Sequence, residues 1–149
     1  MSISKRSLEF GQDNIVGYRI IVTRKLQSML QKELLSRINA AGCEMSATAL
    51  SRIERQHRRV VTDELIAIAI ALGIDANELF NYDIIRQNGV GSVLNEKLLS
   101  RFKFSVATIT KIEQGRRHMY DYEIIWLSEL LDCDPNYLLL FSDEEKSKS

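Results

Sequence analysis

The chain of 149 residues contains an internal repeat, and this feature limits the possible folds more than any other. Residues 46–80 align without a gap on residues 105–139, at an offset of 59, with ten identical positions. Average composition would give roughly two. Residues 18–37 align on residues 82–101, at an offset of 64, with nine more identities, so the first copy carries an insert at residues 38–45. The repeat predicts two similar structural modules rather than one large core.

Both copies have the pattern of short helices, and neither shows the strict alternation of a half-buried strand. Ser46 and its counterpart Ser105 are expected to be N-caps of the helix that follows them. Asp75 and Asp134 are expected to start the last helix of each copy. We therefore predict an all-α fold with five helices in each copy.

Four more polar residues are expected at helix starts. They are Ser28 and Ser92 before the second helix of each copy, and Thr62 and Asp121 before the fourth. Four apolar residues are expected in the core, namely Leu50, Ile53, Ile109 and Ile112.

The predicted organisation divides the chain into four parts. They are an N-terminal arm at 1–12, module 1 at 13–80 with its insert at 38–45, module 2 at 81–141, and an acidic and polar tail at 142–149.

The formal net charge of zero hides alternating blocks of charge. Residues 1–61 carry a net charge of +6, residues 62–99 carry −4, residues 100–120 carry +4, and residues 121–149 carry −6. Two basic blocks, one in each copy, indicate two surfaces that face a polyanion.

The sequence gives no indication of catalysis, a cofactor or a metal. Cys43 and Cys133 belong to no CxxC or Cys/His cluster and are expected to be free thiols, with an exposed sensor thiol at Cys43 as the alternative. His57 and His118 have no ligand partner at metal spacing. Because serine, histidine and acidic residues do not form a catalytic set, we do not expect an enzyme.

No apolar run has the length of a membrane span, and MSISKRSLEF lacks the apolar stretch of a secretory signal. We therefore expect a cytoplasmic protein with no membrane partner.

Several segments resemble the phage repressor and Cro type of helix-turn-helix protein, the XRE family. They are GYRIIVTRKLQSMLQKELL, ALSRIERQHRR and LIAIAIALGIDANELF in copy one, and KIEQGRR and LLDCDPNYLL in copy two. The resemblance covers nearly the whole chain. The sequence departs from the family pattern at Leu30, where threonine is usual, at Gln56, where glycine is usual, and at Asn88, where the family has an arginine.

The resemblance implies two tandem five-helix lambda-repressor-like modules, of which the second is more degenerate. It also implies a cytoplasmic protein encoded by a bacterium or a phage. In this family the glutamate of the recognition helix pairs with an arginine of the first helix, which implies a structural ion pair between Glu54 and Arg24. Glu113 has no matching arginine, because Asn88 stands at that position.

The resemblance further implies that the third helix of each copy enters the major groove of double-stranded DNA. The residues expected to read bases are Ala47, Thr48, Ser51 and Arg52 in copy one and Val106, Ala107, Thr110 and Lys111 in copy two. The residues expected to contact phosphates are Gln31, Lys32, Arg55, His57, Arg58 and Arg59 in copy one and Asn95, Arg116, Arg117 and His118 in copy two.

These residues predict a sequence-specific transcriptional regulator, a repressor, that binds a pseudo-palindromic operator with two modules of one chain. In one alternative, copy one alone binds DNA and copy two forms a homodimer or docks to a partner. Trp126, Tyr122 and Tyr137, which have no aromatic counterparts in copy one, suggest this alternative. In a second alternative, the chain is an antitoxin-like or adaptor protein that uses the fold to bind protein.

Overall fold

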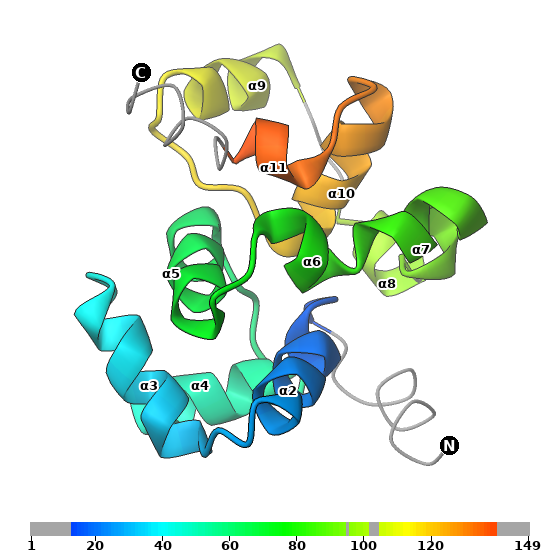
Figure 1. Cartoon of the computed structure of the whole chain (residues 1–149). Helices are drawn as coiled ribbons and strands as arrows, with labels where there is room; N and C mark the ends of the chain where they lie inside the picture. The colour runs from blue at the N-terminus through cyan, green and yellow to red at the C-terminus, as the bar shows by residue number, and fades with distance from the viewer. Residues whose placement is uncertain (1–12, 95, 102–104, 140–149) are drawn as a thin grey trace, which may run out of the picture.

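The computed structural model describes residues 13–94, 96–101 and 105–139. These residues form an all-α fold, as the sequence predicts (Figure 1). The only β-type pairing among them is an isolated bridge between Val61 and Tyr120. Within the same residues, no helix has both the length and the apolar composition needed to cross a bilayer.

The first half of the chain, residues 13–80, forms five helices. They are α2 (Gly17–Leu26), α3 (Gln31–Ala40), α4 (Ala47–Glu54), α5 (Thr62–Leu72) and α6 (Ala76–Phe80). The helix α5 lies at the centre because its sequence TDELIAIAIAL is apolar on most sides, and Leu65, Ile68 and Leu72 are buried in it. Leu34 and Ile38 of α3 and Leu50 and Ile53 of α4 complete this core.

The second half, residues 81–139, follows a similar order, and most of its helices are shorter than their counterparts. Its elements are α7 (Tyr82–Asn88), the 3-10 helix η1 (Val90–Ser92), α8 (Glu96–Leu99), α9 (Val106–Glu113), α10 (Asp121–Leu130) and α11 (Pro135–Leu138). Ile124 and Ile125 of α10 belong to the same core cluster as the first half. Leu98 of α8 packs instead in a separate small cluster with Leu94 and Tyr122.

Two pairs of helix caps repeat between the halves, as predicted. The hydroxyl oxygens of Ser46 and Ser105 accept hydrogen bonds from the third residues of α4 and α9, at 3.0 and 3.1 Å. The carboxylates of Asp75 and Asp134 do the same for α6 and α11, at 2.8 and 2.9 Å. Each cap satisfies a backbone N–H that has no partner within its helix.

The other four predicted caps are wrong. Ser28 has a φ of 54° and belongs to the turn before α3, whose start is capped instead by the Glu33 side chain on the Leu30 N–H. Ser92 ends η1, and its hydroxyl donates to the Gly89 carbonyl. Thr62 and Asp121 are the first residues of their helices rather than N-caps. Glu64 and Glu123 cap these two helices through the backbone N–H groups before them.

The two halves meet through residues that occupy the same position in each repeat. Val61 and Tyr120 form the isolated bridge. The backbone N–H of Asn77 donates to Asn136 Oδ1, and the N–H of Asn136 donates to Asn77 Oδ1, both at 3.0 Å. Reciprocal contacts between equivalent residues are the mark of a two-fold relation. We therefore infer a local pseudo-two-fold axis near both contacts.

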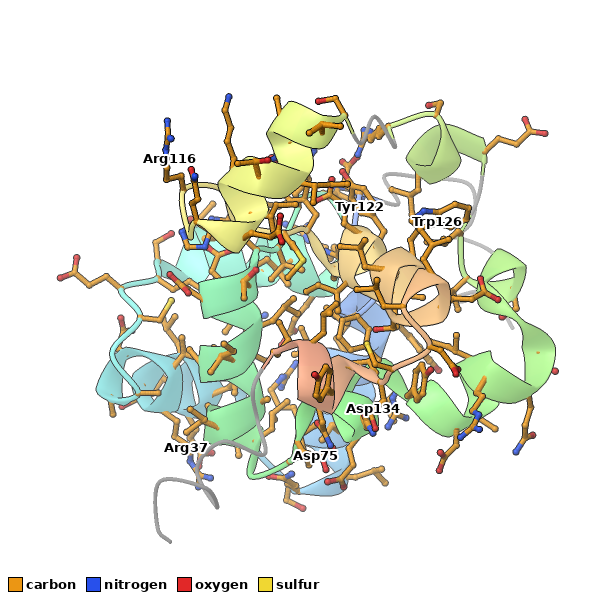
Figure 2. The ribbon with its side chains drawn as sticks, turned by 90° about the horizontal axis from the view of Figure 1, so that it is seen from above. Arg37, Asp75, Arg116, Tyr122, Trp126 and Asp134 are labelled. Atoms are coloured by element: carbon orange, nitrogen blue, oxygen red, sulfur yellow. The ribbon has the colours of Figure 1, made fainter. Side chains whose placement is uncertain are left out.

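A two-fold rotation moves an element to the opposite side of the axis but does not change its height along the axis. We therefore infer that α4 and α9 lie at the same height along the axis, at the same face of the molecule, with the axis between them. Figure 1 shows them at opposite ends, with α6 and α11 between them. In Figure 2, Arg116, just beyond α9, lies on the side opposite to Asp75 and Asp134, which start α6 and α11.

The halves differ most at the second helix. The ten-residue α3 packs along α4 and α5, whereas its counterpart α8 has four residues, and its Leu98 packs with Leu94 and Tyr122. The first helix differs as well. Ile20 is buried in α2, but its counterpart Ile84 is exposed and the next residue, Ile85, is buried instead. The helix α7 therefore presents a different face to its neighbours than α2 does.

Candidate functional site

The α4 helix has one buried face and one exposed face. Leu50 and Ile53 are fully buried, and α4 packs against α2 and α3. Ala47, Thr48 and Arg52 are exposed, and Ser51 is half-buried. The four residues expected to read bases therefore line the outer face of a helix whose inner face is fixed by packing.

An ion pair fixes α4 to α2. Arg24 donates from Nε to Glu54 Oε2 at 2.9 Å and from Nη2 to Oε1 at 3.0 Å, and both side chains are largely buried. The third nitrogen of Arg24 donates to the Met29 carbonyl at 3.0 Å. This is the pair expected from the sequence. Gln31 Nε2 also donates to Glu54 Oε1, at 2.9 Å, so this amide is already engaged inside the protein.

The segment after α4 carries Arg55, His57, Arg58 and Arg59, four of the residues expected to contact phosphate. Gln56 has a φ of 61°, and this left-handed residue ends the helix where the second half has Gly115 with a φ of 71°. Arg58 donates through both Nη atoms to Glu64, at 3.0 and 2.9 Å, and this contact raises the pKa of Arg58. The side chains of Arg55, His57 and Arg59 are exposed.

The second half repeats this segment. Arg117 donates through Nη1 and Nη2 to Glu123, both at 3.0 Å, as Arg58 does to Glu64. Arg58 and Arg117 therefore hold the segment in place within their own halves. Arg116 is exposed, and His118 lies 3.6 Å from Asp63.

The α9 helix is exposed on more sides than α4. The expected base-reading residues are all exposed, namely Val106, Ala107, Thr110 and Lys111. Asn95, expected to contact phosphate, lies outside the described residues. Lys32, at the start of α3 in the first half, is exposed.

The prediction that Ile109 belongs to the core is wrong, because 44% of this residue is exposed while its counterpart Leu50 is fully buried. Ile112 is only half-buried. The cause is the short α8, which does not cover α9 as α3 covers α4. Glu113 is exposed, and the described residues include no ion pair to it.

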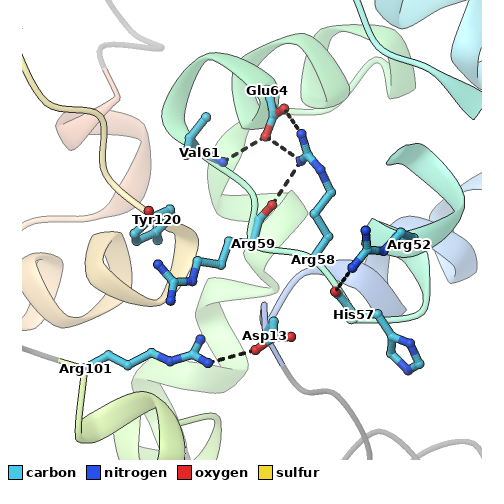
Figure 3. Close-up of a pocket in the computed structure, with 9 residues that line it drawn as sticks. All are labelled: Asp13, Arg52, His57, Arg58, Arg59, Val61, Glu64, Arg101 and Tyr120. Carbon is cyan, nitrogen blue, oxygen red and sulfur yellow. Dashed lines mark hydrogen bonds and ion pairs between the residues drawn. The ribbon is translucent and has the colours of Figure 1, made fainter. Parts of the chain in front are cut away.

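A cleft of about 470 Å³ lies between the end of α4 and the second half (Figure 3). Its lining residues are Asp13, Arg52, His57, Arg58, Arg59, Val61, Glu64, Arg101 and Tyr120. Arg101 of the second half donates to Asp13 Oδ1 at 3.0 Å, and the Arg59 guanidinium lies 4.9 Å from the centre of the Tyr120 ring. Both halves therefore contribute cations to one concave surface.

Beside this cleft, Asp121 joins the halves from within the protein. It is fully buried, and its Oδ2 accepts hydrogen bonds from the backbone N–H groups of Ile15 at 2.7 Å and Val16 at 3.0 Å. Burial raises the pKa of Asp121 to about 7, although these backbone donors act in the opposite direction. The carboxyl group therefore titrates near neutral pH in the folded protein.

Cys43 and Cys133 are free and half-buried. Burial and the nearby carboxylates of Glu64 and Asp63 raise the pKa of the Cys43 thiol. A raised pKa disfavours the reactive thiolate. This does not support the sensor alternative.

Sequence reasoning missed Arg101, Asp13, Tyr120 and the role of Asp121. Arg101 is the repeat counterpart of Arg37, which is exposed in the first half, so the repeat itself gave no reason to single it out. The residues meet only because the halves dock, and the sequence carries no local signal for that docking.

The chain was compared with protein-family models, curated proteins and solved structures, and none of the three comparisons found a match.

Proposed function

We propose that this chain is a DNA-binding transcriptional regulator, a repressor of the phage repressor and Cro type, that presents two recognition helices from one polypeptide. The observation that carries the proposal is the reciprocal contact of equivalent residues from the two halves, from which we infer that a pseudo-two-fold axis relates α4 to α9. Dimeric helix-turn-helix proteins bind two half-sites with two such helices. Here the halves of one chain take the place of two subunits.

The exposed groups of α4 support this proposal. Thr48 and Ala47 suit contact with the thymine methyl, and Arg52 can donate two hydrogen bonds to guanine O6 and N7. Among the described residues, Arg52 Nη2 donates to the His57 carbonyl at 3.2 Å, and no carboxylate pairs with this side chain. This exposed guanidinium can therefore turn to a base at little cost.

The structure refines which cations are expected to contact phosphate. Arg58 and Arg117 are each held by a carboxylate in two hydrogen bonds, and Gln31 is held by Glu54. We expect the exposed side chains that no carboxylate among the described residues holds to bind first. They are Lys32, Arg55, His57 and Arg59 in the first half and Arg116 in the second, whereas His118 lies 3.6 Å from Asp63.

The test is fluorescence anisotropy with a random 20-base-pair duplex at 50 and 200 mM salt. Binding should weaken with salt, with a slope of about 0.9 per phosphate contacted. Replacing Arg55 by glutamine should lower the slope by about one unit. Replacing Arg116 should do the same only if the second half also contacts DNA. The absence of binding at low salt would favour the adaptor reading.

Selection of genomic fragments by the purified protein would then identify the operator. Since α4 and α9 differ at every proposed base-reading position, we expect an imperfect palindrome. Its half-site centres should lie about 10 base pairs apart if both helices contact one face of the duplex.

A second candidate function is favoured by the exposed apolar residues of the second half. Leu130 and Leu131 at the end of α10 are each 61% exposed, and Ile109 of α9, in the same half, is also exposed. In the first half the counterparts Ala71 and Leu72 are buried. We propose for this reading that the second half forms a homodimer, since large exposed apolar side chains mark interaction surfaces. Sedimentation over a range of concentrations would detect it.

The aromatic residues give that reading less support than the sequence suggested. Tyr122 is buried and Trp126 is half-buried, so of the three only Tyr137 is exposed.

A further inference from the structure

The cleft between the halves holds an excess of positive charge. Four arginines and two carboxylates line it. Arg58 pairs with Glu64, and Arg101 pairs with Asp13. Among the described residues, Arg52 and Arg59 have no carboxylate partner, so two positive charges remain unbalanced.

The guanidinium groups are held in place before any ligand binds. Arg59 lies over the Tyr120 ring, which in turn stacks on Tyr122 with ring centres 5.6 Å apart. Arg101 is held by Asp13. Figure 3 shows Arg59 beside Tyr120, with Arg101 and Asp13 joined across the gap between the halves. A planar guanidinium fixed in this way loses little freedom when it binds an oxyanion.

One donor in this arrangement is unused. Nη1 of Arg101 is buried and has no hydrogen-bond partner among the described residues. Buried polar groups without partners are rare in folded proteins. The unbalanced Arg52 and Arg59, together with the guanidinium of Arg101 in the same lining, give the cleft a preference for an acceptor that carries several oxygens and at least two negative charges.

We propose that this cleft is a phosphate-binding site, with Arg59 and Arg101 from the two halves as its principal ligands. Phosphate has the oxygen geometry and charge that arginine binds best. A volume of about 470 Å³ lies in the range of small-molecule sites. A phosphorylated small molecule fits the concave shape, and a backbone phosphate of nucleic acid has the same chemistry. The inference goes beyond the proposed DNA contacts, because it assigns a ligand to Arg101.

The first experiment measures unfolding of the full chain by circular dichroism with inorganic phosphate or pyrophosphate, at an ionic strength matched with sodium chloride. At a concentration ten times the Kd, the ratio of folded to unfolded protein should rise about 11-fold. Arg59→Gln and Arg101→Gln should lose this protection. Arg37→Gln is the matched control, because Arg37 is the repeat counterpart of Arg101, is exposed and does not line the cleft.

A second readout does not depend on stability. The Nε–H signals of Arg59 and Arg101 in a nitrogen-15 spectrum should shift with phosphate and saturate, in contrast to that of Arg37. This keeps the proposal testable if Arg101→Gln destabilises the fold.

A duplex arm separates the two sources of phosphate. Pyrophosphate should protect the protein and compete with a labelled duplex if the cleft takes a small molecule. If inorganic phosphate has no effect, but Arg59→Gln and Arg101→Gln both weaken duplex binding more than Arg37→Gln does, a backbone phosphate is the ligand. Protection that persists in Arg59→Gln, or equal protection by chloride alone, would overturn the proposal, and neither result bears on binding through α4.

Discussion

The carboxylate of Asp121 accepts a hydrogen bond from the backbone N–H of Val16 at 3.0 Å, although the two residues are 105 positions apart in the chain. The contact attaches the first residues before α2 to the start of α10. It is made by a buried acid whose protonation changes near neutral pH.

This acid should make stability depend on pH. Its pKa is about 7 in the folded protein and 3.8 in an unfolded chain, so between these values the folded state binds more protons. The contribution of Asp121 to the free energy of unfolding is therefore fully present below about pH 4 and is lost as the pH rises through 7. The free energy of unfolding falls by up to about 1.4 kcal/mol per pH unit in this range. Urea unfolding should show the advantage of wild type over Asp121→Asn shrinking from pH 5 to pH 8.

Glu129→Gln on the same helix serves as the control, because Glu129 is exposed. Parallel stability curves for wild type and Asp121→Asn would contradict the prediction.

Replacing Glu54 by glutamine should destabilise the protein by about 3 to 5 kcal/mol, because it leaves the largely buried Arg24 without its counter-charge. The same change at the counterpart Glu113, which is exposed, should alter the free energy of unfolding by less than about 0.5 kcal/mol. Chemical denaturation measures both. Equal effects at the two positions would show that the pair does not hold α4 as described.

Asp132 offers a position for stabilisation. It has a φ of 52° after α10, where the first half has Gly73 with a φ of 70° after α5. Because a side chain is strained in this conformation, Asp132→Gly should stabilise the protein by up to about 1 kcal/mol. Thermal unfolding would show a higher Tm. An unchanged or lower Tm would mean that the carboxylate makes a stabilising contribution that outweighs the strain.

The two halves can be compared at matched apolar positions. Leu72→Ser should cost about 2 to 5 kcal/mol, because Leu72 is buried between α5 and its neighbours. Leu131→Ser should change the stability of the monomer by less than about 0.5 kcal/mol, because Leu131 is exposed. A large loss at Leu131 that grows with protein concentration would instead place this residue in a homodimer interface.

Specificity should separate the two DNA-binding readings. On a selected fragment, Arg52→Gln should weaken binding about 5- to 150-fold, which corresponds to the 1 to 3 kcal/mol of a bidentate contact with guanine. Lys111→Gln should have a similar effect only when α9 also reads bases. Fluorescence anisotropy measures the affinity of each variant for the selected and the random duplex. Loss of a base contact should weaken binding to the selected duplex and leave binding to the random duplex unchanged.

Sequence reasoning identified the features that depend on neighbouring residues or on one half alone. The caps at Ser46 and Ser105 involve residues three positions apart, and the Arg24–Glu54 pair lies within one half. The cap expected at Ser28 failed because the tight turn between α2 and α3 requires a left-handed residue there. The helix start lies instead at Leu30, whose backbone N–H donates to the Glu33 side chain.

The contacts between the halves were beyond this reasoning. Arg101 and Asp13 are 88 positions apart, and their pairing depends on how the halves dock. The exposure of Ile109 depends on a neighbour too, because α8 ends after Leu99 where α3 continues to Ala40. Alignment of the repeat transfers residue types between copies, but it does not transfer the packing around them.

Asn77 and Asn136 contact each other within one polypeptide. The effective concentration of one half near the other is therefore set by the connecting chain and not by the amount of protein in the cell. An ordinary dimer dissociates on dilution, and its subunits then lose whatever stability the interface contributed. Here the second half remains tethered to a well-packed neighbour. That tether explains how α9 can keep its place with so little burial of its own.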